Sequence, residues 1–216
     1  SLIVSLDTES WWLGKESSFF EHGSVFVPLL GVAAGCYAVI RGRFPARWLR
    51  WWFLIWVLAT LYFAGEEASW GQHYLGWDTP ESIAEVNKQQ ETNLHNTSSW
   101  LNMQPRSAVE LWILVGGIVV PVVGIIGGRR PGTTDPDRAW DWFWPTSACI
   151  AAASMNYVGR IFDAAFRWFD EDEHVHELLR HLGSSEGREF FIGLFLAAYL
   201  GSAAMRVRSA NAGGLA

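Results

Sequence analysis

The chain has 216 residues, of which 50% are hydrophobic and only 18% are charged, and its formal net charge is −6 at pH 7. Soluble domains carry about a quarter charged residues, so this composition argues against a soluble enzyme and favours a membrane protein. The negative net charge, together with the lack of a basic stripe or a phosphate-cradling glycine loop, argues against a nucleic-acid partner.

Long apolar runs alternate with clusters of charged residues along the chain. Lipid permits no open sheet edge, so runs of this length are expected to cross the bilayer as helices. We therefore predict an all-α integral membrane protein, in which residues 1–216 form a single membrane domain with a bundle of about five transmembrane helices. The predicted spans are about residues 19–40, 48–72, 108–126, 140–166 and 188–205, with extracytoplasmic excursions at 73–107 and 167–187.

Arginine is distributed unevenly over the predicted loops. It is concentrated at 41–50, at 127–139 and in the C-terminal tail, whereas the N-terminal segment and both excursions are acidic. Because positively charged loops stay in the cytoplasm, this pattern predicts an N-terminus outside and a cytoplasmic C-terminus, in a bacterial inner membrane. The seven tryptophans near the arginine-rich loops, from Trp48 to Trp56 and from Trp140 to Trp144, are interpreted as an interfacial aromatic belt on the cytoplasmic side.

The first predicted span carries Gly31 and Gly35, four residues apart. This small-xxx-small spacing lets another helix approach closely.

The stretch Tyr62–Gly76 gathers polar side chains at the end of a very apolar run. If the helix continues to Gln72, then Glu66, Ser69 and His73 share one face, while Glu67 points about 100° away. Ionisable groups inside spans are rare and normally face a bundle interior or a cavity, so this stretch is the centre of our functional hypothesis.

A second polar group lies in the later half of the predicted fourth span. Asn156, Arg160 and Asp163 share one helix face there, and the predicted topology brings them to the same side of the membrane as Glu66. We expect a shared pocket in which a crowded, partly desolvated carboxylate suits acid/base work or metal binding.

The roles assigned to these residues follow from their chemistry. The predicted catalytic residues are Glu66, Glu67 and His73, and the predicted binding residues are Arg160, Asn156, Ser69 and Gln72. The predicted metal ligands are Glu66, Glu67, His73, His95 and Asp163, a set that suits a divalent ion such as zinc. The alternative is structural: an arginine–carboxylate pair in a membrane bundle can hold helices together without any chemistry.

Two established metal templates do not fit. A di-iron carboxylate bundle needs Glu-x-x-His on two helices, and Glu66 and Glu67 have Ser69 and Trp70 at the required position. The zincin spacing His-Glu-x-x-His is absent from the sequence.

The string Gly65-Glu-Glu-Ala-Ser-Trp-Gly-Gln72, followed by Thr79-Pro-Glu81 and Asn93-Leu-His-Asn96, resembles a group of bacterial multi-pass membrane proteins of uncharacterised function. The likeness covers about the central third of the chain and implies an integral-membrane fold. Ser69-Trp-Gly-Gln-His73 is also similar to the Ser-x-x-x-His motif of alkaline-ceramidase-type membrane hydrolases, which implies zinc and a lipid substrate. The later His-x-x-x-His of those hydrolases is missing here.

The leading hypothesis is a membrane protein with an extracytoplasmic carboxylate and histidine pocket, acting as a metal-dependent hydrolase on a lipid-like substrate. The alternative is a non-catalytic subunit that docks with other membrane subunits and contacts pigment, quinone or lipid. A carrier that uses the carboxylates as an ion path is disfavoured, because the predicted cytoplasmic half of the spans carries no charge and the sequence has no repeat.

Overall fold

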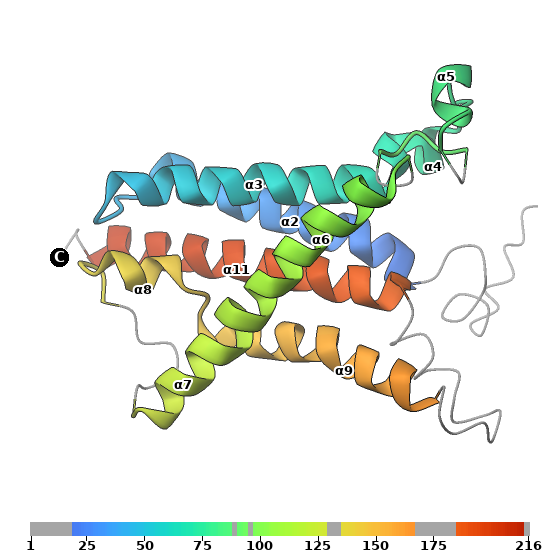
Figure 1. Cartoon of the computed structure of the whole chain (residues 1–216). Helices are drawn as coiled ribbons and strands as arrows, with labels where there is room; N and C mark the ends of the chain where they lie inside the picture. The colour runs from blue at the N-terminus through green and yellow to red at the C-terminus, as the bar shows by residue number, and fades with distance from the viewer. Residues whose placement is uncertain (1–18, 88–89, 95–96, 129–134, 167–184, 214–216) are drawn as a thin grey trace, which may run out of the picture.

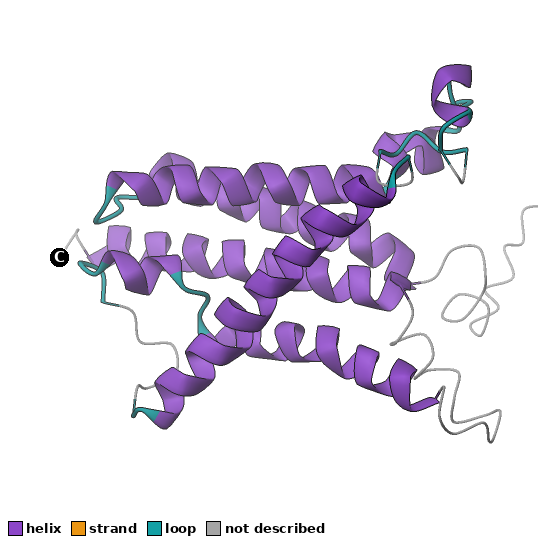
Figure 2. Cartoon of the chain, viewed as in Figure 1, coloured by secondary structure: helices purple, strands orange, loops and turns teal. Residues whose placement is uncertain are grey.

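The computed structural model describes residues 19–87, 90–94, 97–128, 135–166 and 185–213. Every regular element in this part of the chain is a helix, which confirms the predicted all-α class (Figure 1, Figure 2). Four helices are long and apolar enough to cross a membrane, and they are Phe19–Arg41, Arg47–Glu67, Met103–Ile126 and Glu186–Ala212.

The core is built around α11 (Ser185–Gly213), which lies beside α2 (Phe19–Arg41) and α3 (Arg47–Glu67) (Figure 1). In its most apolar stretch 61% of the residues are buried inside the chain, against 22–39% in the other three candidate spans. A helix that is apolar on all sides suits such a central position.

The predicted close approach at Gly31 and Gly35 is confirmed. A Cβ atom on Gly31 would lie 2.7 Å from the Cα of Ala197, and one on Gly35 would lie 2.5 Å from a methyl group of Val57. Because no side chain fits into these gaps, the two glycines allow α2 to pack directly on α11 and α3.

The third crossing is longer than predicted. It begins with α6 (Ser99–Trp112), continues through a π-helical stretch (Ile113–Val119) and ends with α7 (Val120–Ile126), and it runs obliquely across the other helices in Figure 1. The predicted start at residue 108 was too late, because Pro105 was interpreted as part of a loop. Pro105 lies in the second turn of α6, where proline normally kinks or ends a helix, so the sequence favoured a later start.

The predicted fourth span over 140–166 is wrong, because this segment is not one continuous helix. The structure has a short α8 (Ala139–Phe143), a break at Pro145, a single turn (Ser147–Cys149), and α9 (Ile150–Phe166). Proline cannot continue α8, and it forces the preceding residue into an extended conformation. The 17 residues of α9 leave it shorter than the four candidate spans.

The tryptophans form two groups rather than one belt. Trp51 is 66% exposed, as expected at an interface, whereas Trp142 and Trp56 are only 2% and 8% exposed. Trp56 packs against Trp112 and Tyr199, and Trp142 packs edge-on against Phe44. The hydroxyl of Tyr199 accepts a hydrogen bond from Trp52 Nε1 at 2.7 Å. The belt interpretation is therefore wrong for the buried members, which belong to the core.

The second predicted span was expected to reach residue 72, but α3 ends at Glu67. A left-handed turn follows, and then the short helices α4 (Gln72–Leu75) and α5 (Glu81–Ala84), which project beyond the end of the bundle (Figure 1). We call the described residues between 68 and 94 the cap.

Candidate functional site

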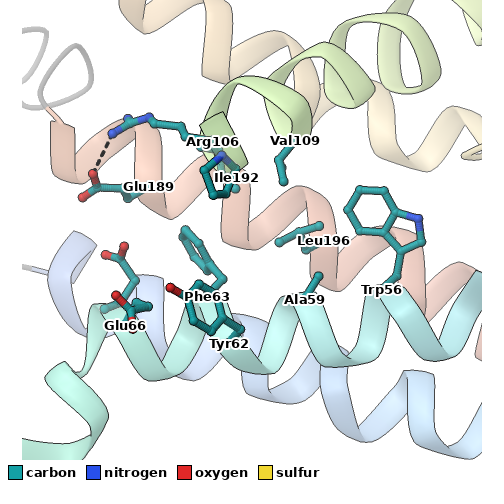
Figure 3. Close-up of a pocket in the computed structure, with 12 residues that line it drawn as sticks. Trp56, Ala59, Tyr62, Phe63, Glu66, Arg106, Val109, Glu189, Ile192 and Leu196 are labelled. Atoms are coloured by element: carbon teal, nitrogen blue, oxygen red, sulfur yellow. Dashed lines mark hydrogen bonds and ion pairs between the residues drawn. The ribbon is translucent and has the colours of Figure 1, made fainter. Parts of the chain in front are cut away.

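A cavity of about 150 Å³ opens between α3, α6 and α11, next to the cap (Figure 3). Most of its wall is apolar, and the apolar lining includes Trp56, Ala59, Phe63, Val109, Ile192 and Leu196. Its charged lining residues are Glu66, Glu67, Arg106 and Glu189. Figure 3 shows Glu66, Arg106 and Glu189 at one end of the cavity and Trp56 at the other, so the cavity has a polar end and an apolar end.

Arg106 is the cation at the polar end. Its Nη1 lies 3.0 Å from Oε1 of Glu189, and its Nε lies 3.3 Å from Oε1 of Glu110, one turn further along α6. The third guanidinium nitrogen, Nη2, is buried and has no hydrogen-bond partner among the described residues. A guanidinium has five N–H donors, so Arg106 keeps donor capacity after both ion pairs are made.

Glu66 and Glu67 are neighbours at the end of α3 and differ in their surroundings. Glu66 is buried, and its carboxylate accepts one hydrogen bond from Trp70 Nε1 at 2.7 Å and another from the backbone N–H of Leu94 at 2.8 Å. Glu66 therefore lines the cavity and also fixes the cap to the bundle. Glu67 instead interacts electrostatically with Glu189 and Arg106.

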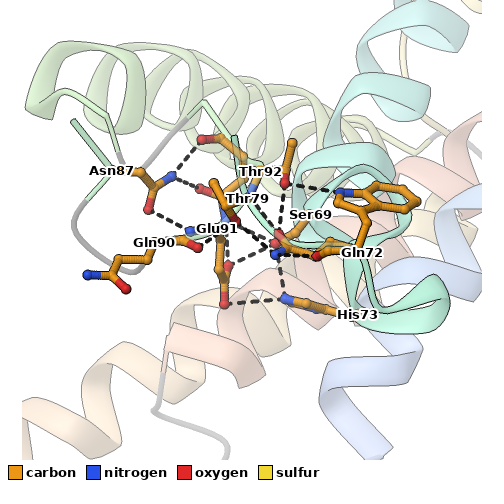
Figure 4. Close-up of polar contacts among 10 residues, drawn as sticks. Ser69, Gln72, His73, Thr79, Asn87, Gln90, Glu91 and Thr92 are labelled. Atoms are coloured by element: carbon orange, nitrogen blue, oxygen red, sulfur yellow. Dashed lines mark hydrogen bonds and ion pairs between the residues drawn. The ribbon is translucent and has the colours of Figure 1, made fainter. Parts of the chain in front are cut away.

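A network of polar side chains holds the cap together (Figure 4). Ser69, which is fully buried, donates from its hydroxyl to Oε2 of Glu91 at 2.8 Å and lies 3.0 Å from Nε2 of His73. Asn93 donates to both Ser69 and Glu91, at 3.1 and 2.7 Å. The same His73 nitrogen is 3.3 Å from Oε1 of Glu91.

This geometry differs from that of a serine nucleophile. In a catalytic triad the acid binds the histidine nitrogen that faces away from the serine. Here one nitrogen of His73 contacts both Ser69 and Glu91, and the Ser69 hydroxyl already donates to the carboxylate. The arrangement therefore suits a fastening role in the cap.

Gln72 connects the two ends of the cap segment. Its amide nitrogen donates to the carbonyl oxygen of Trp77 at 3.2 Å and to the hydroxyl of Thr79 at 2.8 Å. Its amide oxygen accepts from both the backbone N–H and the hydroxyl of Thr92, at 2.7 and 2.9 Å. All the hydrogen-bonding capacity of this side chain is thus spent inside the protein.

The cap is entered through a strained backbone. Ser69 and Trp70 have φ angles of 44° and 56°, and Gly71 follows at 103°. Residues with side chains rarely adopt this left-handed region, and each costs of order 1 kcal/mol. The hydrogen bonds from Ser69 to Glu91 and from Trp70 to Glu66 hold the two residues there.

The structure separates the predicted site into two parts. Glu66 and Glu67 line the cavity, whereas Ser69, Gln72 and His73 belong to the cap network. The prediction that Glu66, Ser69 and His73 share one face of a continuous helix is wrong, because the helix ends at Glu67 and the chain turns left-handed.

The predicted residues of α9 have different outcomes. Asn156 is fully buried, and neither atom of its amide group has a hydrogen-bond partner among the described residues; it is not among the residues that line the cavity. Arg160 and Asp163 lie in α9, but their side chains are outside the described part of the structure. His95 lies entirely outside the described residues.

Arg106 and Glu91 were missed as site residues. Arg106 follows Pro105 and was counted as part of the excursion, although its spacing to Glu110 is that of a helical ion pair. Glu91 had no local signal, because its role depends on contacts with Ser69 and His73 about twenty residues earlier in the sequence.

The described residues contain no group of three or more histidine, cysteine, aspartate or glutamate side chains placed to hold a metal ion. His73 and Glu91 form the one pair of metal-type ligands in the described part of the cap network. Two of the five predicted ligands, His95 and Asp163, lie outside the described side chains, so the zinc site stays a prediction.

A scan against protein-family models found no match, and searches of curated proteins and of solved structures found none either. The resemblances noted in the sequence are therefore neither supported nor contradicted by these comparisons.

Proposed function

We propose that this integral membrane protein binds the head group and first carbons of a single-chain, lipid-like amphiphile in the cavity. The observation that carries the proposal is the division of the cavity into an apolar wall and a charged end, with buried donors that have no partner in the described protein. An amphiphile has the same division.

The volume of the cavity limits the ligand. About 150 Å³ is the size of an engineered protein cavity that binds benzene, and drug-sized ligands need about 300 Å³ or more. A whole phospholipid is therefore too large. The cavity suits a slim head group and the adjoining methylenes, with the rest of the tail in lipid.

The polar end specifies the chemistry of the head group. Nη2 of Arg106 has no acceptor among the described residues, and the carboxylate of Glu67, which interacts with Ser24, can accept a further hydrogen bond. A hydroxyl or an amide can satisfy both at once. We therefore infer a neutral head group of this kind, such as that of a long-chain alcohol or amide.

The same carboxylates support hydrolytic or acid/base chemistry on the bound head group. Glu67 is desolvated by burial and lies near the carboxylates of Glu189 and Glu66 and the guanidinium of Arg106. Carboxylates in such sites are frequent acid/base catalysts. We also propose that a divalent ion such as zinc binds His73, beside the carboxylate of Glu91 in the cap. Metal analysis of the purified protein, compared with His73→Ala, tests that part separately.

The placement in the membrane follows the charges. Arg41, Arg47 and Arg208 lie at helix ends opposite the cap, which supports a cytoplasmic location for that end and an external location for the cap. We propose that α9 is the fifth span and that the protein resides in a bacterial inner membrane. Accessibility of single cysteines, placed at Glu81 and at Arg43, to an impermeant thiol reagent tests this orientation.

Photo-crosslinking tests the cavity directly. A long-chain alcohol with a diazirine on its first methylenes should label residues of the cavity, such as Val109 and Ile192, in protein purified in mild detergent. Glu67→Leu should reduce this labelling about tenfold, because it removes the acceptor for the head group, while Glu81→Leu in α5 should leave it unchanged. Labelling spread evenly over lipid-exposed residues such as Leu58 and Val123 would refute the proposal.

A non-catalytic subunit is the second candidate. Only 22% of the residues in the apolar stretch of Met103–Ile126 are buried inside the chain, the lowest share of the four candidate spans. This helix could therefore cover a neighbouring membrane subunit. Co-purification with other chains, combined with full function of Glu67→Gln, would favour this candidate over the first.

A further inference from the structure

The end of the bundle opposite the cap has a second hollow, of about 400 Å³. Its lining includes three arginines, Arg43, Arg47 and Arg50, together with Trp51. The hollow lies where α2 passes into α3. The end of α11 is close by, because the Asn211 side chain donates to the carbonyl oxygen of Arg41 at 3.4 Å.

The described residues do not balance the charge of this hollow. Among the described residues, no carboxylate lies within ion-pair distance of Arg43, Arg47 or Arg50, in contrast to Arg106 and Arg138, which have such partners. Arg50 is held in place by a hydrogen bond from Nη2 to the carbonyl oxygen of Gly42 at 2.9 Å. The side chains of Arg43 and Arg47 are exposed, and three cations in one hollow repel each other unless an anion lies between them.

The backbone adds donors at the same place. Helix α3 begins at Arg47, and its N-cap residue Ala46 provides no side-chain acceptor for the first N–H groups. Both residues line the hollow. The N-terminus of a helix of 21 residues therefore adds to the attraction that the arginine side chains already exert on an anion.

The position of the hollow indicates the kind of anion. It lies at the end of a candidate membrane span, and Trp51, which is 66% exposed, is typical of the head-group level of a bilayer. Basic hollows between helices at this level bind the phosphates of anionic lipids. Arginine suits such a ligand because its planar fork makes two parallel hydrogen bonds to phosphate oxygens.

We propose that Arg43, Arg47 and Arg50 form a binding site for a phosphate oxyanion, supplied by the head group of an anionic phospholipid. This site is independent of the proposed amphiphile cavity, because the two lie at opposite ends of α3 and share no residue.

The test measures lipid binding to the full chain in neutral detergent by native mass spectrometry. Phosphatidylglycerol should bind the wild type at least tenfold more tightly than phosphatidylcholine does. The double variant Arg43→Gln/Arg47→Gln should bind phosphatidylglycerol about twenty-five-fold more weakly than the wild type, from roughly fivefold for each arginine. The matched control Arg138→Gln/Arg208→Gln loses the same charge at the same end of the bundle and should bind within threefold of the wild type.

Further arms separate the possible causes. If the glutamine variant melts at a lower temperature than the wild type, Arg43→Lys/Arg47→Lys keeps the charge and should still weaken binding severalfold, because the planar fork is lost. Equal losses in the glutamine variant and the arginine control would overturn the proposal, and so would equal binding of the two lipids. Binding of millimolar inorganic phosphate without selective binding of phosphatidylglycerol would support the oxyanion site and overturn its lipid source.

Discussion

The cap and the cavity lie on either side of Glu66, and they differ in how far their polar atoms are hydrogen-bonded. In the cap, Gln72 uses both atoms of its amide group and Asn93 donates to two acceptors. In the cavity, buried donors of Arg106 and Trp56 have no partner among the described residues. Satisfied polar groups indicate a fastened structure, whereas unsatisfied ones beside a cavity indicate where a ligand is expected to bind.

The largest expected effect comes from removing the residue that the two regions share. Glu66→Ala leaves the indole of Trp70 and the N–H of Leu94 without their acceptor, so the protein should lose about 3 kcal/mol of stability. Detergent-titrated unfolding measures this loss. Glu81→Ala, on the exposed surface of α5, is the control and should change stability by less than about 0.5 kcal/mol. Similar losses of stability for Glu66→Ala and Glu81→Ala would mean that Glu66 does not fasten the cap to the bundle.

The next effect should be confined to the cap. Gln72→Ala removes the side chain that connects Trp77, Thr79 and Thr92, at a local cost of about 2 kcal/mol. Hydrogen exchange at the amide of Thr92 should become about thirtyfold faster, while amides in the middle of α11 keep their protection. Uniform acceleration over the whole chain would mean that the cap is not a separate unit.

A gain in stability is expected inside the bundle. Asn156→Leu replaces a buried amide that has no partner among the described residues by an apolar group of similar volume, and should stabilise the protein by about 1 kcal/mol. A thermal melt in detergent measures the change. Destabilisation would instead assign Asn156 to a ligand or to buried water, and would extend the unsatisfied region into α9.

The smallest expected effect separates two neighbouring tryptophans on α3. Nε1 of Trp52 donates to Tyr199 at 2.7 Å, whereas the same atom of Trp56 has no partner among the described residues. Trp52→Phe should therefore cost about 1 kcal/mol more than Trp56→Phe, since both lose similar ring volume. Comparison of the two melting curves is the measurement, and a larger loss for Trp56→Phe would contradict it.

Much of the bundle could be predicted from the sequence, because apolar length and helix-packing glycines are local signals. Helix α2 lies within one residue of its predicted bounds, whereas α11 (Ser185–Gly213) extends beyond the predicted 188–205 at both ends. The end of α3 could not be predicted in this way. Nothing in the sequence of residues 68–70 stops a helix, and the left-handed turn there depends on Glu91 and Glu66.

The candidate site was predicted in composition but not in arrangement. Carboxylates of different helices do gather at one end of the bundle, where Glu66 and Glu67 meet Glu189. His73 was assigned to the same site because a continuous helix would have aligned it with Glu66. One reversed turn of backbone moved the imidazole into the cap, and no periodicity in the sequence could have indicated this.

The π-helical stretch Ile113–Val119 has a consequence for the helix that contains it. A π-helical turn contains about one residue more than an α-helical turn. Each added residue rotates the segment after it by about 100° relative to the segment before it, compared with an uninterrupted α-helix. Arg106 can thereby face Glu189 while Val123 and Ile126 face outward, at 62% and 81% exposure. Deleting Gly116 would rewind this stretch and turn one of the two faces away from its present neighbours.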